Sequence, residues 1–344
     1  MRIAWVGPLP PLLGGVAQHG LRTTEALIDA GHAVHVESWR SIYPSRFYPM
    51  EQPLGPGRMR WWNPVSWIRA GRRCRGADLV VISWVTPFHA IALRVVLAAS
   101  GGTRAVLMAH NALPHEPMPF QAGLLRLVGR RCRGAVAHAT TVPARLRELT
   151  DLDAIEIVPH PPNLPLVPTP LPPGPPNRVL FFGVVRPYKG IELALDAVAA
   201  RPELHLTIAG ESWDPRPDEL ESEIAARGLS DRVDLRLGYL DDADIASLFE
   251  EHHLLVAPYR DATVSGVVPL AHAAGRPVVV TPVGGLPEAV TDGFDGVVAV
   301  AASAGAVGEA IDRAHADLES LAAGAARARP TWAAVARALV VAAG

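Results

Sequence analysis

The stretch PHPPNLPLVPTPLPPGPPN, residues 159–177, decides how the rest of the chain is divided, because ten of its 19 residues are proline. Proline lacks an N–H donor and its ring fixes φ, so neither a helix interior nor a central strand tolerates this density. We therefore expect an extended, semi-rigid linker. At 344 residues the chain is also long enough for two ordinary domains, one on each side of that linker.

Short apolar runs alternate with longer amphipathic segments on both sides of the linker. Before it, the strand-like runs are RIAWVG, AVHVES, DLVVISW, AVLMAHN, AVAHAT and AIEIVPH, and residues 16–29 have helical spacing. After it, the pattern restarts with RVLFFG, LHLTIAG, VDLRLGY, LLVAPY and PVVVTP. Strands that alternate with helices favour a parallel sheet covered on both faces. The predicted fold class is therefore α/β, with two doubly wound, Rossmann-like domains.

The two halves of the chain differ in charge. Residues 1–176 carry 18 arginines and 10 acidic residues, whereas residues 177–344 carry 14 cationic and 24 acidic residues. The net charges of +8 and −10 sum to the −2 of the whole chain, and the basic half is expected to meet something anionic. The predicted divisions are an N-terminal domain at 1–165, a linker at 166–177, a second domain at 178–328 and a closing helix at 329–344 that packs back across the linker.

Composition excludes several classes of protein. Two cysteines, Cys74 and Cys132, are too few for a disulfide framework and are spaced wrongly for a zinc site. The opening MRIAWVG is typical of a strand rather than a signal peptide, and no uncharged apolar run reaches the about 18 residues of a membrane-spanning helix. The chain is slightly acidic and has no recognition module for nucleic acid. We expect a cytoplasmic protein.

The loops that follow the strands are the first candidates for a site, because ligands of doubly wound sheets bind beyond the carboxyl ends of the strands. In RVLFFGVVRPYKG, residues 178–190, Gly183 ends a strand and Arg186 and Lys189 follow it beside a predicted helix. Lys189 is the only lysine of the chain. A planar guanidinium and a compact ammonium complement each other on a diphosphate. Solvated loop charges are the alternative, but the single retained lysine favours phosphate binding.

A second loop, APYRDATVSGVVPLA at residues 257–271, offers backbone amides to an anion. Ser265 is a suitable N-cap, and the amides of Gly266, Val267 and Val268 would then point at a ligand at the helix N-terminus. An ordinary capped helix without a ligand explains the same residues. The sequence leaves both readings open.

Two loops of the first half also follow strands. In PPLLGGVAQHG, residues 10–20, Gly14 and Gly15 permit close approach of a ligand to the backbone, although a plain tight turn is equally compatible. In MAHNALPHEPMPF, residues 108–120, prolines on both sides of the second histidine prevent a regular helix from aligning metal ligands. A histidine that hydrogen-bonds a substrate is favoured there over a metal site or a purely structural role. The polar residues of this loop are His110, Asn111, His115 and Glu116.

Together these segments resemble a family-4 glycosyltransferase of the GT-B fold. The resemblance is carried by FFGVVRPYKGIELALDA, by LTIAGESW and by the stretch from LRLGYLDD to GGLPEAV, and more moderately by GGVAQHGLRTTEALIDAGHAV, HNALPHE and the closing PTWAAVARAL. It implies two domains that face each other across a cleft, with the donor mainly on the second and the acceptor on the first. It also implies a nucleoside-diphosphate-sugar co-substrate, retention at the anomeric carbon, and neither a metal nor a cofactor.

The resemblance assigns roles to individual residues. Arg186 and Lys189 match the pair that neutralises the departing diphosphate, and His110 matches a histidine that contacts the donor sugar. On the side of the sugar or acceptor it implies Asn111 with His115 and Glu116. The implied donor-binding set is Gly14, Gly15, Gly183, Glu211, Tyr239, Leu240, Thr263, Ser265, Gly266 and Val267.

One departure from the family concerns the ribose of the donor. The family usually has two glutamates eight residues apart, and these positions fall on Ala262 and Leu270. Leu270 cannot bind ribose hydroxyls. The chain is identified as a member of a branch with ATxSGVxPLA here. Glu211 and Glu288 are the nearby acids that could compensate, although Glu288 also suits the first turn of a helix.

Residues 58–77 and 121–135 combine arginines with tryptophans or leucines, a composition that suits an anionic membrane surface on the inner leaflet. Amphipathic helices packed on the sheet are the alternative.

The predicted function is transfer of a sugar to a hydroxyl acceptor, such as a lipid-linked, polysaccharide or secondary-metabolite glycan. Another GT-B nucleotide-sugar enzyme, such as an epimerase, and an inactive nucleotide-sugar-binding scaffold remain as alternatives.

Overall fold

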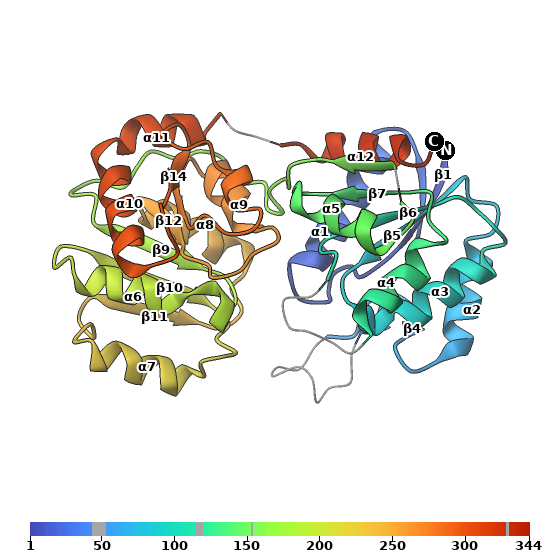
Figure 1. Cartoon of the computed structure of the whole chain (residues 1–344), viewed down its shortest axis with the longest axis horizontal. Helices are drawn as coiled ribbons and strands as arrows, with labels where there is room; N and C mark the ends of the chain where they lie inside the picture. Colours follow the sequence, from blue (N-terminus) through green and yellow to red (C-terminus); the bar gives the residue numbers. More distant parts are fainter. Residues whose placement is uncertain (43–52, 114–119, 153, 328–329) are drawn as a thin grey trace. The chain divides into compact units, whose positions relative to one another are not determined.

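The computed structural model describes residues 1–42, 53–113, 120–152, 154–327 and 330–344. The chain folds as two compact units, each an α/β structure built on a parallel sheet (Figure 1). The first unit comprises Met1–Pro159 and Thr331–Gly344, and the second comprises His160–Pro330. The predicted fold class is thus confirmed for both halves.

The sheet of the first unit has the strand order β2-β1-β5-β6-β7-β8, and all its neighbouring pairs are parallel. Its strands are β1 (Arg2–Val6), β2 (Ala33–Glu37), β5 (Leu79–Trp84), β6 (Ala105–Ala109), β7 (Gly134–Ala137) and β8 (Ala154–Ile157); β3 (Trp39–Ser41) and β4 (Met59–Arg60) pair separately. The helices are α1 (Gly15–Asp29), α2 (Pro64–Arg73), α3 (Ala90–Ala99), α4 (Gln121–Gly129), α5 (Thr141–Leu149) and α12 (Trp332–Val341). β5 and β6 are buried along their whole length, and their residues are apolar except for Ser83 of β5.

The closing helix α12 belongs to the first unit. Its side chains Val335 and Leu339 are buried in one apolar cluster with Ile3 and Trp5 of β1. A Cβ on Gly134 of β7 would lie 2.3 Å from the carbonyl oxygen of Ala342, so the glycine lets the helix end approach the sheet closely. The helix therefore covers the same face of this sheet as α1, while α3, α4 and α5 contribute to the cluster on the other face.

The sheet of the second unit has the strand order β11-β10-β9-β12-β13-β14 and is also parallel. Its strands are β9 (Arg178–Phe182), β10 (His205–Gly210), β11 (Val233–Leu237), β12 (Leu254–Ala257), β13 (Val278–Val280) and β14 (Gly296–Val298). Its helices are α6 (Ile191–Ala199), α7 (Pro217–Ala226), α8 (Asp242–Glu251), α9 (Val267–Ala273), α10 (Ala304–Ala316) and α11 (Leu318–Ala325). Helices α6, α7 and α10 bury one face of the sheet, and α8 and α9 bury the other.

The proline-rich segment is part of the second unit rather than a free spacer. Residues 160–177 form neither a helix nor a strand, as their prolines predict. Arg276, which is only 1% exposed, donates to the Thr169 carbonyl at 2.7 Å, the Thr169 hydroxyl at 2.9 Å and the Pro170 carbonyl at 2.8 Å. One buried arginine thereby fastens the extended segment to its own unit.

The two cysteines and the helix lengths can be compared with the expectations drawn from the composition. Cys74 and Cys132 are both free thiols, and burial raises the pKa of each to about 12. A thiol held protonated in this way is a poor nucleophile and a poor metal ligand. Over the described part of the chain, no helix is both long enough and apolar enough to cross a bilayer.

Candidate functional site

Lys189 is buried in the loop that follows β9. It ends a short 3-10 turn, Pro187–Lys189, directly before α6, and only 9% of the residue is exposed. Its ammonium lies 5.3 Å from the centre of the Tyr259 ring. Gly183 has a φ of 112°, and a Cβ there would lie 2.9 Å from the Lys189 Nζ. The glycine that ends β9 therefore leaves the space in which the lysine head sits.

The surroundings of the Lys189 ammonium disfavour its charge. Burial lowers the pKa of Lys189 below its usual value, and the neighbouring Arg186 lowers that pKa further, while Tyr188 acts in the opposite direction. Among the described residues, no carboxylate and no hydrogen-bond acceptor pairs with the ammonium. Buried charges in proteins are normally paired, so this cation lacks the partner that an anionic ligand would supply.

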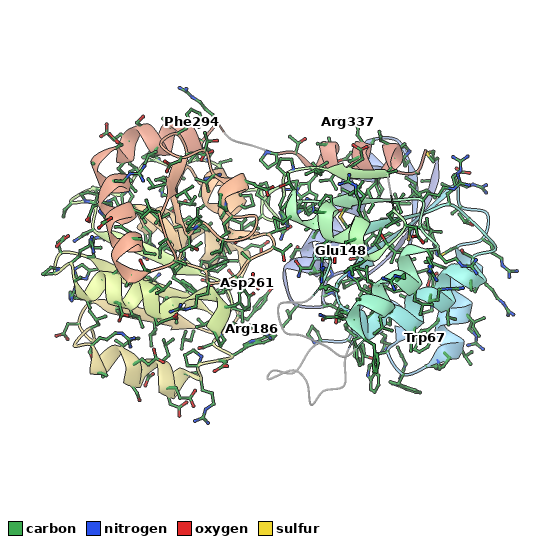
Figure 2. All side chains as sticks on the ribbon, in the orientation of Figure 1. Trp67, Glu148, Arg186, Asp261, Phe294 and Arg337 are labelled. Atoms are coloured by element: carbon green, nitrogen blue, oxygen red, sulfur yellow. The ribbon has the colours of Figure 1, made fainter. Side chains whose placement is uncertain are left out.

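Arg186 lies three residues before Lys189 and is half-buried (Figure 2). Its guanidinium carbon lies 4.3 Å from the centre of the Trp213 ring, within the range of a cation–π contact. The indole N–H of Trp213 donates to a Glu211 carboxylate oxygen at 2.7 Å. Glu211, predicted to contact the donor, thus also holds the ring on which Arg186 rests. Trp213 has no role predicted from the sequence, because a tryptophan in a loop shows no periodicity that would indicate its partner.

The predicted cap of the helix after β12 is wrong in one respect. Gly266 is the N-cap of α9, and no side chain caps this helix. The Ser265 hydroxyl instead lies 3.3 Å from the hydroxyl of Tyr259. Burial raises the pKa of Tyr259 to about 12, and the hydrogen bond to Ser265 opposes that rise. Helix α9 has only seven residues, and Gly266 and Val267 at its start are half-buried.

The two positions where the resembled family has glutamates are part of the apolar core. Ala262 is 5% exposed and Leu270 is 7% exposed, and both belong to the cluster that packs α8 and α9 on the sheet. A Cβ on Gly284 would lie 1.5 Å from the Ala262 carbonyl oxygen, so the backbone of this loop is tightly covered. Leucine fits this cluster and a carboxylate would not. Glu288 lies on an exposed turn at Pro287–Ala289.

The remaining donor-side predictions lie on loops of the second unit. Tyr239 and Leu240 follow β11, and Tyr239 is 53% exposed. Thr263 lies in the loop before α9 and is half-buried. The structure thus brings Gly183, Arg186 and Glu211 together through contacts of neighbouring loops, while it shows no direct contact of Tyr239 with that group.

His110 directly follows β6 in the first unit and lies beside a second histidine, which was not predicted from the sequence. Its Nε2 is 3.2 Å from the Ser83 hydroxyl, and its ring meets the ring of His19 edge-on at 4.5 Å between centroids. His19 is a buried residue of α1, four positions after Gly15. In GGVAQHG, a histidine on the helix that directly follows the glycine loop could have indicated that His19 lies near the predicted site.

His19 pairs with a further buried histidine, His138, which follows β7. Their Nε2 atoms are 2.8 Å apart, and His138 Nδ1 lies 2.8 Å from the Val158 carbonyl. A carbonyl only accepts, so His138 Nδ1 donates and its Nε2 accepts from His19. His19 Nδ1 then accepts from the Thr23 hydroxyl, 3.2 Å away. Each ring nitrogen of this pair has a partner while both imidazoles are neutral.

The first unit contains a small cavity at the carboxyl ends of β1 and β5. It has a volume of about 230 Å³, and Gly14 and Gly15 form part of its wall with Ser83. The floor is aromatic, since Trp39 and His89 stack at 4.6 Å between centroids. Burial lowers the pKa of His89 to about 4, although a hydrogen bond to the Ile42 carbonyl opposes that shift. Asn111 is half-buried after His110, whereas the predicted His115 and Glu116 lie outside the described residues.

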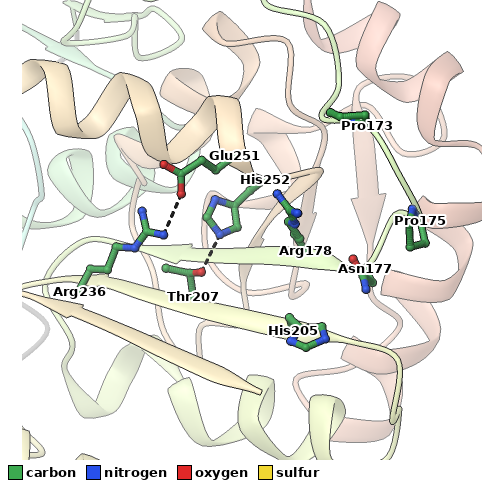
Figure 3. A pocket seen from close by; sticks show the side chains of 9 residues that line it. All are labelled: Pro173, Pro175, Asn177, Arg178, His205, Thr207, Arg236, Glu251 and His252. Atoms are coloured by element: carbon green, nitrogen blue, oxygen red, sulfur yellow. Dashed lines mark hydrogen bonds and ion pairs between the residues drawn. The ribbon is translucent and has the colours of Figure 1, made fainter. Parts of the chain in front are cut away.

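A larger cavity, of about 430 Å³, lies in the second unit near the amino ends of its strands (Figure 3). Arg178 begins β9 at its wall. Several of its polar groups bond one another: His252 Nε2 lies 2.7 Å from the Thr207 hydroxyl, and Arg236 forms an ion pair with Glu251 at 2.8 Å. Because ligands of doubly wound sheets bind at the opposite ends of the strands, this cavity is not the candidate site.

Comparison with known proteins finds sequence similarity that lies mainly in the second unit. Residues 176–317, less than half of the chain, match the model of the family described as glycosyl transferases group 1. A GDP-mannose:glycolipid 4-beta-D-mannosyltransferase of Xanthomonas campestris pv. campestris is 31% identical over 188 residues, which are 52% of this chain and 50% of that protein. A D-inositol 3-phosphate glycosyltransferase of Mycobacterium tuberculosis is 35% identical over 137 residues, 39% of this chain and 28% of that protein. The chain thus matches half or less of the length of these relatives.

Solved structures extend the likeness to the whole chain. Sucrose-phosphate synthase from Thermosynechococcus elongatus has a TM-score of 0.79 at 19% identity, covering 98% of this chain and 97% of that one. Anabaena HepE in complex with UDP has a TM-score of 0.70 at 18% identity, covering 99% and 97%. At such identities the likeness concerns the fold: the chain has the GT-B type of architecture, with two Rossmann-like domains. The match to the model of group 1 glycosyl transferases is confined to residues 176–317 of the second unit.

Proposed function

We propose that this protein is a glycosyltransferase of family 4, in the branch with ATxSGVxPLA, that moves a sugar from a nucleoside diphosphate to a hydroxyl group with retention. The observation that carries the proposal is the buried Lys189 ammonium, which no carboxylate balances among the described residues and which lies beside Arg186 after β9. The family match of the second unit supports it. So do the names of the relatives and neighbours, which include a GDP-mannose-dependent transferase and a complex with UDP.

The two cations would act on the leaving group. Negative charge develops on the diphosphate oxygens as the bond to the sugar breaks, and cations already in place lower the barrier without reorganisation. Lys189 would contribute a compact point charge from the buried side, and Arg186 a planar fork from the half-buried side. A Cβ built on Gly183 would lie 2.9 Å from the Lys189 Nζ, so the glycine leaves room for the ammonium. A guanidinium is larger than an ammonium and would need more space at this position. This accounts for a single lysine in a chain that otherwise uses arginine.

The other predicted residues would hold the donor and the acceptor. The uncapped amides at Gly266 and Val267 are available to the diphosphate, and neither a metal nor a cofactor is part of the proposal. Since Leu270 belongs to the core, the ribose would be held by other groups of the donor site. In the first unit, Gly14 and Gly15 in the wall of the small cavity would contact the donor, His110 would contact the transferred sugar, and Asn111 would lie on the side of the sugar or acceptor.

Calorimetric titration with UDP, GDP, ADP and TDP tests the donor class directly. One of the nucleotides should bind, and Lys189→Ala should weaken that binding by about a hundredfold. Transfer from the corresponding sugar nucleotide, followed by NMR of the product, then reports whether the anomeric configuration is kept. An inverted product would contradict retention, and absence of binding to every nucleotide would contradict the donor site.

The same assay separates the alternative functions. An epimerase would convert the sugar nucleotide without any acceptor and would release no nucleoside diphosphate in step with product. A scaffold would bind the nucleotide without turnover, so Lys189→Ala would change affinity and no rate. Transfer that depends on both the acceptor and Lys189 would exclude both alternatives.

We further propose that α2, α3 and α4, which pack in that order, lie on an anionic membrane surface. Residues 53–135 contain 12 arginines and only two acids, Asp78 and Glu116. Large apolar side chains are exposed in the same segment, and these are Leu54, Trp62, Val65, Ile68, Ile91, Phe120 and Leu127. Basic and apolar groups together favour anionic lipid.

Vesicle flotation tests this proposal. We expect the protein to float with anionic vesicles, less so at high salt, and not to float with zwitterionic vesicles. Equal flotation with both kinds of vesicle would refute the proposal.

A further inference from the structure

We infer that Trp213 is a positioning residue for Arg186, and that Glu211 serves the site by holding the Trp213 ring. The inference rests on the proposed function, since it concerns how Arg186 meets a diphosphate. It begins with two contacts in series: the guanidinium lies 4.3 Å from the centre of the indole ring, and the indole N–H donates to Glu211 at 2.7 Å. Tryptophan is the aromatic residue that attracts a cation most strongly.

The choice of an aromatic partner for Arg186 has a chemical reason. A carboxylate could orient the guanidinium, but it would occupy the N–H fork and cancel the charge that the diphosphate needs. An indole face orients the same group and leaves its positive charge uncancelled. The Glu211 carboxylate instead accepts a hydrogen bond from the indole N–H of Trp213. A hydrogen bond to an anion polarises the indole ring that faces the guanidinium.

The backbone holds both partners in one rigid arrangement. The Val185 N–H donates to the Glu211 carbonyl at 2.7 Å, and the Trp213 N–H donates back to the Val185 carbonyl at 3.2 Å. The loop after β9, which carries Arg186, is therefore bonded to the loop after β10, which carries Glu211 and Trp213. The Ser212 hydroxyl donates to the Pro215 carbonyl at 2.6 Å and closes the second loop on itself. The Trp213 ring, which orients Arg186, thus lies on a loop that is hydrogen-bonded to the loop carrying Arg186.

This arrangement gives Glu211 a role other than the ribose contact. One of its oxygens accepts from Trp213, so glutamine, whose side-chain carbonyl also accepts, should preserve the contact. Leucine at the same position removes it. If Glu211 acts through Trp213, Glu211→Leu should add nothing to a variant that already lacks the ring.

A double-mutant cycle on nucleoside-diphosphate affinity tests the inference, with GDP and UDP as the probes. Trp213→Leu should weaken binding about tenfold, the size expected of a partly desolvated cation–π contact. In the Arg186→Ala background the same change should weaken binding less than about twofold, because the partner is gone. Trp213→Phe, which keeps a ring face, should lie between wild type and leucine. Phe294→Leu, which truncates an exposed aromatic side chain elsewhere in the same unit, is the matched control and should bind as wild type does.

Three outcomes overturn the inference. Equal weakening by Trp213→Leu with and without Arg186 would mean that the ring contacts the nucleotide itself or merely supports the loop. Wild-type affinity in Trp213→Leu, with Arg186→Ala impaired, would mean that Arg186 needs no platform while the proposed donor site stands. Failure of wild type to bind either probe would refute the proposed function and the inference with it.

Discussion

Two sites of buried polar side chains, one in each unit, differ in whether the protein itself supplies their partners. In the second unit, Lys189 is a buried ammonium without a balancing group among the described residues, and its pKa is lowered by burial. In the first unit, His19 and His138 are buried polar groups whose ring nitrogens are matched with a carbonyl, a hydroxyl and each other. The histidine pair is complete without a ligand, whereas the lysine site is incomplete. An anionic ligand would supply the partner that the Lys189 charge lacks, so the lysine site is where we expect binding.

The comparison can be sharpened by placing a second unbalanced charge in the second unit. Leu270→Glu restores the residue type of the resembled family at a position that is only 7% exposed. Burying a carboxylate without a partner should destabilise the protein by about 3 kcal/mol or more, measured by urea denaturation. Leu270→Met, which conserves volume, should lose less than about 1.5 kcal/mol. Tighter nucleotide binding in Leu270→Glu, at wild-type stability, would show that this position faces the ribose after all.

The histidine pair offers the converse test, because its polar groups are satisfied. His138→Leu leaves the His19 N–H without its acceptor and the Val158 carbonyl without its donor, so a loss of about 2 kcal/mol of stability is expected. His19→Leu should cost a similar amount. The double variant should lose clearly less than the sum, since both changes remove the same hydrogen bond. Strict additivity of the two losses would contradict the pairing.

The pH dependence of nucleotide affinity should differ from that of an ordinary lysine site. The pKa of Lys189 in the free protein is lowered below its usual 10.5, and a bound diphosphate would raise it again. Affinity should therefore be fully present at low pH and fall as the pH rises through the lowered pKa, by about tenfold per pH unit between the free and bound values. Over the same range the ligand-free protein should become more stable, because the unfolded chain holds the proton more tightly. An affinity that is flat up to pH 10.5 would contradict the burial of the charge.

Much of the fold followed from the sequence because strand and helix periods are local. The β9 run RVLFF and the loop residues after it lie where the pattern placed them, and the prolines of 160–177 exclude regular structure. What periodicity could not show was the partner of that segment: Arg276 fastens it, and its contacts with Thr169 and Pro170 span more than a hundred residues. Such contacts depend on the folded topology, and the spacing of residue types along the sequence does not predict them.

The candidate site divides in the same way. Lys189 stood out because it is a unique residue, and Gly183 because it ends a strand, so both were found from the sequence. Trp213 was missed because its role depends on two loops being bonded side by side. Ser265 was predicted to cap α9 because a serine before a helix is a good N-cap in general, but Gly266 occupies the N-cap position and the Ser265 hydroxyl bonds that of Tyr259.

The most direct test of the central claim is to replace the unbalanced cation with a neutral side chain of similar length, in Lys189→Met. Removing a buried charge that has no partner in the free protein should raise ligand-free stability by about 1–2 kcal/mol in urea denaturation. The same change should weaken the nucleoside diphosphate bound by wild type about a hundredfold in calorimetry, the scale of losing a desolvated charge pair. A variant that is less stable than wild type and binds the nucleotide unchanged would show that Lys189 supports the fold, and would contradict the account.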